Sequence, residues 1–95
     1  MVTPVTPTAG LASSVPSAGT PVPVFPEDIN GGFIQNPATA PGLLFVDAVN
    51  PAGTTAEGTT FALAAGESWH AIPGQTTITT VNADVDGQVF SAIYW

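Results

Sequence analysis

Short apolar runs separated by turn residues dominate the chain from residue 43 onward. Over Thr59–Ala64 the two kinds of position alternate, with Phe61 and Leu63 on one side and Thr60 and Ala62 on the other. A period of two predicts β-strands, and no stretch of helical length repeats apolar residues at helical spacing. The predicted strands are Phe33–Gln35 at a sheet edge, Leu43–Val49, Thr59–Ala64, Ser68–Ile72, Thr76–Val81 and Gln88–Trp95.

Turn residues fill every gap between these runs. Asn50-Pro51-Ala52-Gly53 ends one strand, and Pro73-Gly74 ends another. Asp86-Gly87 closes the segment 82–87 and predicts a hairpin. The predicted fold class is therefore all-β, a small β-sandwich or jelly-roll-like barrel. Its expected core is Leu44, Phe45, Val46, Phe61, Leu63, Ile72, Ile78, Val81, Phe90 and Ile93.

The first part of the chain has a different composition. Six of the ten prolines fall within residues 1–26, among Thr, Ser, Ala, Gly and Val. Proline lacks a backbone donor and favours extended neighbours, so neither a helix nor a central strand is expected there. We therefore predict an extended Pro-rich N-terminal arm over residues 1–29 and a β-domain over 30–95. Because Val22, Val24 and Phe25 are apolar, an arm lying along a neighbouring protein fits better than a disordered tail.

The charge balance excludes several classes of partner. The 95 residues include no Lys or Arg and seven acidic residues, which gives a formal net charge of −7. Binding to nucleic acid requires cations that replace the counterions of the phosphates, so no nucleic-acid partner is expected. The absence of cysteine removes disulfides as a means of stabilising so small a domain, which leaves oligomerisation or docking. Neither a signal peptide nor a membrane-spanning segment is predicted.

Residues that commonly carry out catalysis are sparse. The single histidine, His70, would need a serine such as Ser68 or Ser91 and an acid such as Asp47, but no local motif joins them. We therefore expect no enzyme activity and no cofactor, and a small hydrolase based on His70 is a weaker alternative. The oxygens of Asn82, Asp84 and Asp86 alternate as in a calcium loop, yet the closing acid and flanking helices are missing. An acidic turn without metal is the better interpretation.

The aromatic residues near the C-terminus are candidates for binding. Tyr94 and Trp95 are consecutive in a predicted strand, so they point to opposite faces and at least one should lie outside the core. Exposed aromatic side chains are common contact residues in interfaces. The predicted partner-binding residues are Val22, Val24, Phe25, Tyr94 and Trp95. A carbohydrate- or surface-binding module of a fibre or adhesin, with Trp69 or Trp95 as its platform, is the main alternative.

The order of segments resembles a known kind of virion protein. A Pro-rich arm is followed by GGFIQNPATAPG, LLFVDAVNPAG, TTFALAAGESWHAIPGQTTITTVNA and a closing FSAIYW. This arrangement is similar to the small decoration, or cement, proteins of tailed bacteriophages. The resemblance implies a structural protein on the outer surface of the assembled capsid, which binds the major capsid protein and stabilises the shell. It also implies a homo-oligomer, with a trimer favoured, whose arms hold neighbouring subunits, and it implies no catalytic residues.

Overall fold

The computed structural model describes residues 5–95, and that range contains ten β-strands and no helix. No described helix is therefore long and apolar enough to cross a membrane. The strands are β1 (Thr8–Ala9), β2 (Ser14–Val15), β3 (Val22–Phe25), β4 (Gly32–Gln35), β5 (Leu44–Asp47), β6 (Thr60–Leu63), β7 (Ser68–His70), β8 (Thr79–Ala83), β9 (Gln88–Val89) and β10 (Ser91–Tyr94).

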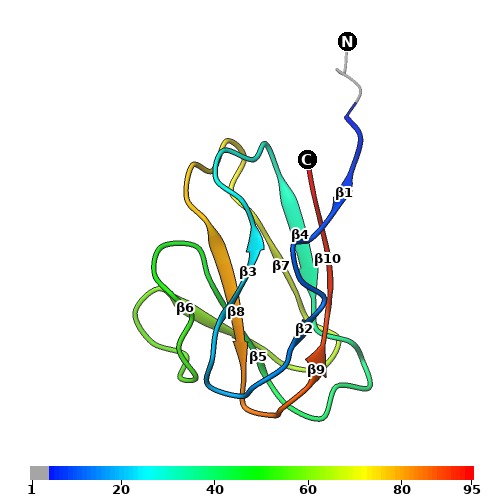
Figure 1. The fold of residues 1–95 in the computed structure, drawn as a ribbon, viewed down its shortest axis with the longest axis vertical. Coiled ribbons are helices and arrows are strands. Elements are labelled where there is room, and N and C mark those ends of the chain that lie inside the picture. Colours follow the sequence, from blue (N-terminus) through cyan, green and yellow to red (C-terminus); the bar gives the residue numbers. More distant parts are fainter. Residues whose placement is uncertain (1–4) are drawn as a thin grey trace.

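Two antiparallel sheets of four strands form a sandwich. Sheet 1 has the order β1-β10-β4-β7, and sheet 2 has the order β3-β8-β5-β6. Strands β2 and β9 form a separate two-stranded sheet. The all-β sandwich predicted from the alternating pattern is confirmed (Figure 1).

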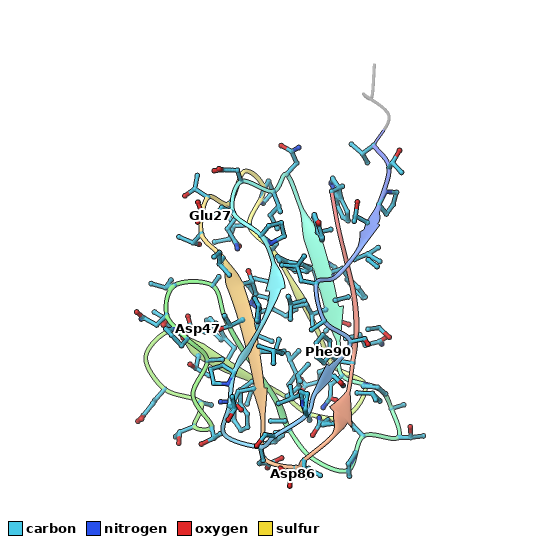
Figure 2. The ribbon with its side chains drawn as sticks, viewed as in Figure 1. Glu27, Asp47, Asp86 and Phe90 are labelled. Atoms are coloured by element: carbon cyan, nitrogen blue, oxygen red, sulfur yellow. The ribbon has the colours of Figure 1, made fainter. Side chains whose placement is uncertain are left out.

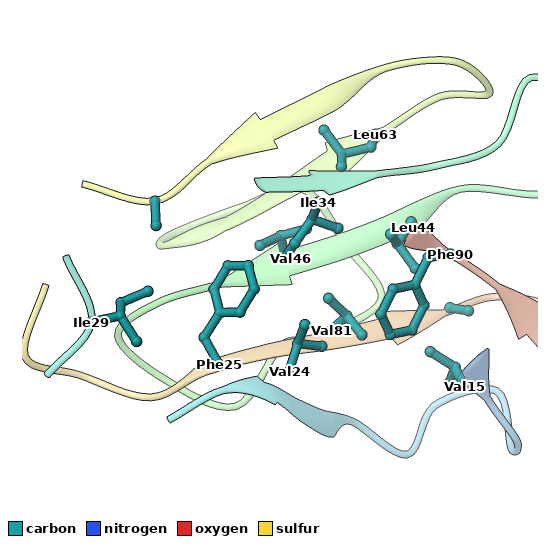
Figure 3. Close-up of a cluster of buried hydrophobic side chains, with 12 residues drawn as sticks. Val15, Val24, Phe25, Ile29, Ile34, Leu44, Val46, Leu63, Val81 and Phe90 are labelled. Atoms are coloured by element: carbon teal, nitrogen blue, oxygen red, sulfur yellow. The ribbon is translucent and has the colours of Figure 1, made fainter. Parts of the chain in front are cut away.

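The core lies between the two sheets. Ile34 of sheet 1 and Leu44, Val46 and Val81 of sheet 2 are fully buried, and Figure 3 shows them gathered with the other buried apolar side chains. Burial of each such side chain contributes about 1.5–3 kcal/mol. Because the chain has no Lys or Arg, this apolar packing and the backbone ladders stabilise the fold without the salt bridges that those residues would form.

The Pro-rich segment is part of this sandwich. It is extended, as predicted, but it runs antiparallel to the last strands along most of its length (Figure 1). Thr8 lies opposite Tyr94 in sheet 1, and Val22 lies opposite Val81 in sheet 2. Between them, the amide of Phe90 donates to the carbonyl of Ser13 at 3.0 Å. The expectation of an arm that leaves the domain over residues 1–29 is therefore wrong from Thr8 onward, and residues 1–4 lie outside the described residues.

The segment changes sheets at Gly10. A Cβ added to Gly10 would lie 2.8 Å from the Cβ of Ala92 and 3.2 Å from Cγ1 of Val24. The amide of Gly10 donates to the carbonyl of Ala92, and the amide of Leu11 donates to the carbonyl of Val24. Two consecutive residues are thus bound to different sheets, and the close approach that this requires leaves no room for a side chain at Gly10.

Several details of the sequence prediction need correction. Phe61, Ile72, Ile78 and Ile93 were expected in the core, but all of them are exposed. The core instead takes side chains from the segment expected to be an arm and from the turn-rich region after it. These unexpected core residues are Val15, Val24, Phe25, Ile29 and Ile34.

Two predicted strand relationships also differ in the structure. The strand at Phe33–Gln35 is not at an edge, because β4 lies between β10 and β7. The turn that ends in Asp86-Gly87 does not close a hairpin, since β9 pairs with β2 and β8 pairs with β3 and β5. A turn signal in the sequence marks a reversal of direction but does not determine which strand becomes the partner.

Candidate interaction surface

The outer face of sheet 1 is formed by every second residue of its strands. In β10, Ala92 and Tyr94 pack against the core, so Ile93 between them faces outward. In β4, Ile34 is fully buried, so its neighbour Phe33 faces outward as well. The same alternation and pairing place these residues on the outer face: Ala9, Phe33, Gln35, Ser68, His70, Ser91 and Ile93.

The three apolar residues of this face and His70 form one continuous row across the sheet. Ala9 lies opposite Ile93, Ile93 lies opposite Phe33, and Phe33 lies opposite His70. The rings of Phe33 and His70 meet edge to face, with centroids 4.8 Å apart. Ser91, Gln35 and Ser68 form a second, polar row beside it. Residues directly opposite on neighbouring strands have adjacent side chains, so the first row is a single, largely apolar strip four strands wide.

Trp95 extends the same ladder beyond β10. Its amide donates to the carbonyl of Gly31 at 3.0 Å, and the amide of Gly31 donates back to Trp95 at 3.2 Å. A Cβ added to Gly31 would lie 2.7 Å from two atoms of the indole ring. The indole of Trp95 therefore lies directly over the backbone of Gly31. Trp95 keeps 36% of its surface exposed.

No acidic residue lies on the outer face of sheet 1. The seven carboxylates of the chain are distributed over the loops and sheet 2, at Glu27, Asp28, Asp47, Glu57, Glu67, Asp84 and Asp86. The outer face of sheet 1 therefore carries no carboxylate side chain, although the protein as a whole has a formal net charge of −7. Charged residues are depleted in the buried centres of interfaces, and this surface has that property.

The outer face of sheet 2 is covered by the protein itself. The loop between β5 and β6 folds over it, and Ala52 of that loop is buried. The amide of Ala52 donates to Oγ1 of Thr80, and its carbonyl accepts from the side chain of Asn82, both at 2.9 Å. Phe45, which alternates with the core-facing Leu44 and Val46, is buried as well. The two faces of the sandwich thus differ, since this loop shields sheet 2.

A buried carboxylate fixes the start and end of this covering loop. Oδ1 of Asp47 accepts hydrogen bonds from the amides of Val49 and Asn50, each at 2.8 Å. Its Oδ2 accepts from the hydroxyls of Thr59 and Thr60 at 2.7 and 2.8 Å. Burial by itself raises the pKa of Asp47, but these hydrogen bonds outweigh it and hold the pKa below its usual range. The carboxylate is fully engaged in joining both ends of the loop, which is a structural role.

The five residues predicted to bind a partner differ in how exposed they are. Val24 and Phe25 are fully buried in the protein's own core, and Val22 packs against that core. Val24 and Phe25 therefore have no surface to offer a partner, whereas Val22 is partly buried in a strand that is paired with β8. Tyr94 is half-buried and its ring packs on Phe25. Trp95 alone lies at the outer face as expected.

Two of the residues considered for catalysis, His70 and Asp47, lie in different sheets. His70 lies on the outer face of sheet 1, whereas Asp47 is buried at the end of β5 in sheet 2. Within residues 5–95 no hydrogen bond joins the His70 side chain to Ser68 or Ser91. The arrangement of base, nucleophile and acid that the hydrolase alternative requires is not assembled.

Two of the three side chains considered for calcium, Asn82 and Asp86, accept hydrogen bonds within the fold. The side-chain oxygen of Asn82 accepts from the amides of Gly19 and Ala83, and Asp86 accepts from the amide of Ala18 at 2.7 Å. Among the described residues there is no group of three His, Cys, Asp or Glu side chains placed to hold a metal ion. Asn82 and Asp86 instead fasten the loop after β2 to strand β8 and the turn that follows it.

Sequence reasoning missed the central residues of the candidate surface. Phe33 was assigned to a short edge strand, and Ile93 was assigned to the core. Trp69, considered as a sugar platform, packs against the core instead. The alternation in Phe33-Ile34-Gln35 was a usable signal, but alternation alone does not tell which of the two faces is buried.

Comparisons of this chain with protein-family models, with curated proteins and with solved structures found no match.

Proposed function

We propose that the protein is a non-enzymatic structural protein that docks onto a larger protein assembly through the outer face of sheet 1. The observation that supports this proposal is the strip of Ala9, Ile93, Phe33 and His70, which lies in register on a face without acidic residues. The opposite sheet has its own covering loop. A largely apolar strip on an uncovered face without acidic residues has the composition of an interface centre.

The energy available at this face suits a repeated, individually modest contact. Removal of Phe33 and Ile93 from water contributes up to about 1.5–3 kcal/mol each, and association itself has a cost of comparable or greater size. A single copy would therefore bind weakly. Many copies on a repetitive surface would gain occupancy wherever neighbouring copies also contact one another.

The assembly we propose is the outer surface of a tailed-phage capsid, in keeping with the resemblance to decoration proteins. A protein that binds only the assembled shell stabilises that shell by mass action. The docking differs from the expected one, because the N-terminal segment from Thr8 onward belongs to the sandwich and does not serve as an arm. The strip on sheet 1 takes over the contact that the arm was expected to make.

The test is co-sedimentation of the purified protein with empty, expanded capsids of the phage that encodes it. The variant Phe33→Ser/Ile93→Ser removes the centre of the strip. The control Phe61→Ser/Leu43→Ser changes an exposed phenylalanine and an exposed leucine, an isomer of isoleucine, in β6 and directly before β5 of sheet 2. We expect the wild type and the control to sediment with capsids and the strip variant to remain in solution.

Three results would count against the proposal. The first is that the wild type sediments no more than an unrelated protein does, and the second is that both double variants bind equally well. A glycan-array signal that is lost in Trp95→Ala would support the carbohydrate-binding alternative. Light scattering measures the oligomeric state of the purified chain. A dimer that dissociates in Phe33→Ser/Ile93→Ser would mean that a second copy occupies the strip.

A further inference from the structure

Three loops meet at one end of the sandwich, away from the strip on sheet 1. They are the loop between β3 and β4, the first part of the loop between β5 and β6, and the loop between β7 and β8. Together they enclose an open depression of about 480 Å³. Glu27 lies at this end of the molecule and Asp86 lies at the opposite end (Figure 2).

Hydrogen bonds between the loops hold this depression in shape. The amide of Ile29 donates to the carbonyl of Gln75 at 3.0 Å, which joins the β3–β4 loop to the β7–β8 loop. The hydroxyl of Thr77 donates to the carbonyl of Ala48, which joins the β7–β8 loop to the β5–β6 loop. The side chain of Gln75 also donates to the carbonyl of Thr77. Since the loops are tied to one another, the depression is preformed and needs little ordering when a ligand enters.

The lining combines apolar walls with one carboxylate. Val49 is 65% exposed and Ile78 is 44% exposed, and both line the depression together with Pro51. Glu27 supplies the negative charge, and the remaining lining residues are polar and neutral: Asn50, Thr76, Thr77 and Thr80. The chain contains no Lys or Arg, so no such side chain of the protein itself pairs with Glu27. A cationic partner for this carboxylate has to come from another molecule.

These features point to one kind of occupant. A lysine side chain has a four-carbon apolar stem and a charged end, and such side chains bury the stem along apolar surface while the charge stays near water. The lining includes no aromatic ring on which a guanidinium would stack, which favours lysine over arginine. We propose that the depression binds a lysine side chain of the protein partner, with its stem against Val49, Pro51 and Ile78 and its ammonium at Glu27. Only the source of the lysine rests on the proposed function.

The test needs no capsid. The isotope-labelled full chain is titrated with Nα-acetyl-lysine N-methylamide and followed by amide NMR shifts, and Nα-acetyl-norleucine N-methylamide serves as the uncharged probe with the same stem. We expect saturable shifts at Val49, Asn50 and Thr76–Ile78 with a dissociation constant of roughly millimolar size. The norleucine probe should bind about two- to fivefold more weakly, the difference that an exposed ion pair supplies.

Two variants test whether the charge of Glu27 causes the preference for lysine over norleucine. Glu27→Gln should remove the preference for lysine, whereas Glu57→Gln should keep it, because Glu57 lies in the later part of the β5–β6 loop and does not line the depression. Phe33→Ser/Ile93→Ser should leave the titration unchanged, so a failure of the capsid proposal remains distinguishable from a failure of this one. Equal affinity for both probes, loss of the preference in Glu57→Gln, or the absence of saturable shifts at these residues would overturn the inference.

Discussion

The rings of Phe25 and Tyr94 pack against each other with centroids 5.8 Å apart and planes inclined by 58°. Phe25 comes from the Pro-rich segment and Tyr94 from the last strand, and both were expected to contact a partner. Phe25 is instead fully buried between the sheets, and Tyr94 covers it. The contact joins the two ends of the chain in one core, which is why the segment expected to be an arm is necessary for the fold.

Replacement of Phe25 by alanine should therefore destabilise the protein strongly. Truncation of a buried phenylalanine costs about 3–5 kcal/mol, because apolar burial is lost and a cavity remains. Phe61→Ala is the matched control, since Phe61 is 59% exposed and its truncation should cost less than about 1 kcal/mol. Urea unfolding followed by circular dichroism measures both. Equal costs for the two variants would contradict the placement of Phe25 in the core.

Removal of the Asp47 carboxylate should loosen the loop that covers sheet 2. Asp47→Ala leaves two part-buried amides and two hydroxyls without their acceptor and should cost about 3 kcal/mol. Asp47→Asn keeps one oxygen for the amides, and the threonine hydroxyls can turn to accept from the new amide group, so it should cost only about 1 kcal/mol. Thermal unfolding of the three proteins gives the order. A smaller cost for alanine than for asparagine would count against this hydrogen-bond network.

The same carboxylate should make the fold sensitive to acid. The pKa of Asp47 is lower in the folded protein than in the unfolded chain, where it is about 3.9. The stabilisation is therefore fully present above the unfolded value and is lost as the pH falls through the folded value. The difference in unfolding free energy between wild type and Asp47→Asn should be constant near neutral pH and shrink below about pH 4. A difference that does not change with pH would exclude a charged Asp47 as the cause.

Gly31 should tolerate no side chain, because the indole of Trp95 covers it. In Gly31→Ala the new methyl would lie within 2.7–2.9 Å of three ring atoms, so the ring has to move outward. We expect a cost of about 1–3 kcal/mol and a red shift of tryptophan fluorescence. Gly53→Ala is the control, because a Cβ there would have a single neighbour, at 4.0 Å. Unchanged fluorescence in Gly31→Ala would contradict the packing of Trp95 on Gly31.

The period-two pattern predicted many of the strands of the sandwich. It did not predict the pairing of the N-terminal segment with the last strand. Strands β5, β6 and β7 lie within the ranges predicted for them, because alternation and turn residues are local properties of the sequence. The pairing of Thr8 with Tyr94 is not local, since it joins residues at the two ends of the chain. Proline content also argued against strands near the N-terminus, yet Pro23 fits in β3 because that strand is at the edge of sheet 2 and needs fewer donors.

The candidate surface was predicted only in its last residue, Trp95. The sequence does not reveal which face of an alternating strand is covered, because that depends on tertiary neighbours such as the loop over sheet 2. Ile93 was expected inside for this reason, although Tyr94 and not Ile93 faces the core. Likewise, Ile78 fits a buried strand by composition, but it precedes β8 and lines the depression at the end of the sandwich.

Electron cryomicroscopy of capsids incubated with the protein tests the central proposal most directly. The account predicts bound copies whose sheet 1 faces the shell, with Phe33 and Ile93 in the contact and the loop over sheet 2 turned away from it. Capsids that carry no added density, or copies seated on the shell through sheet 2 with the strip open to solvent, would contradict it.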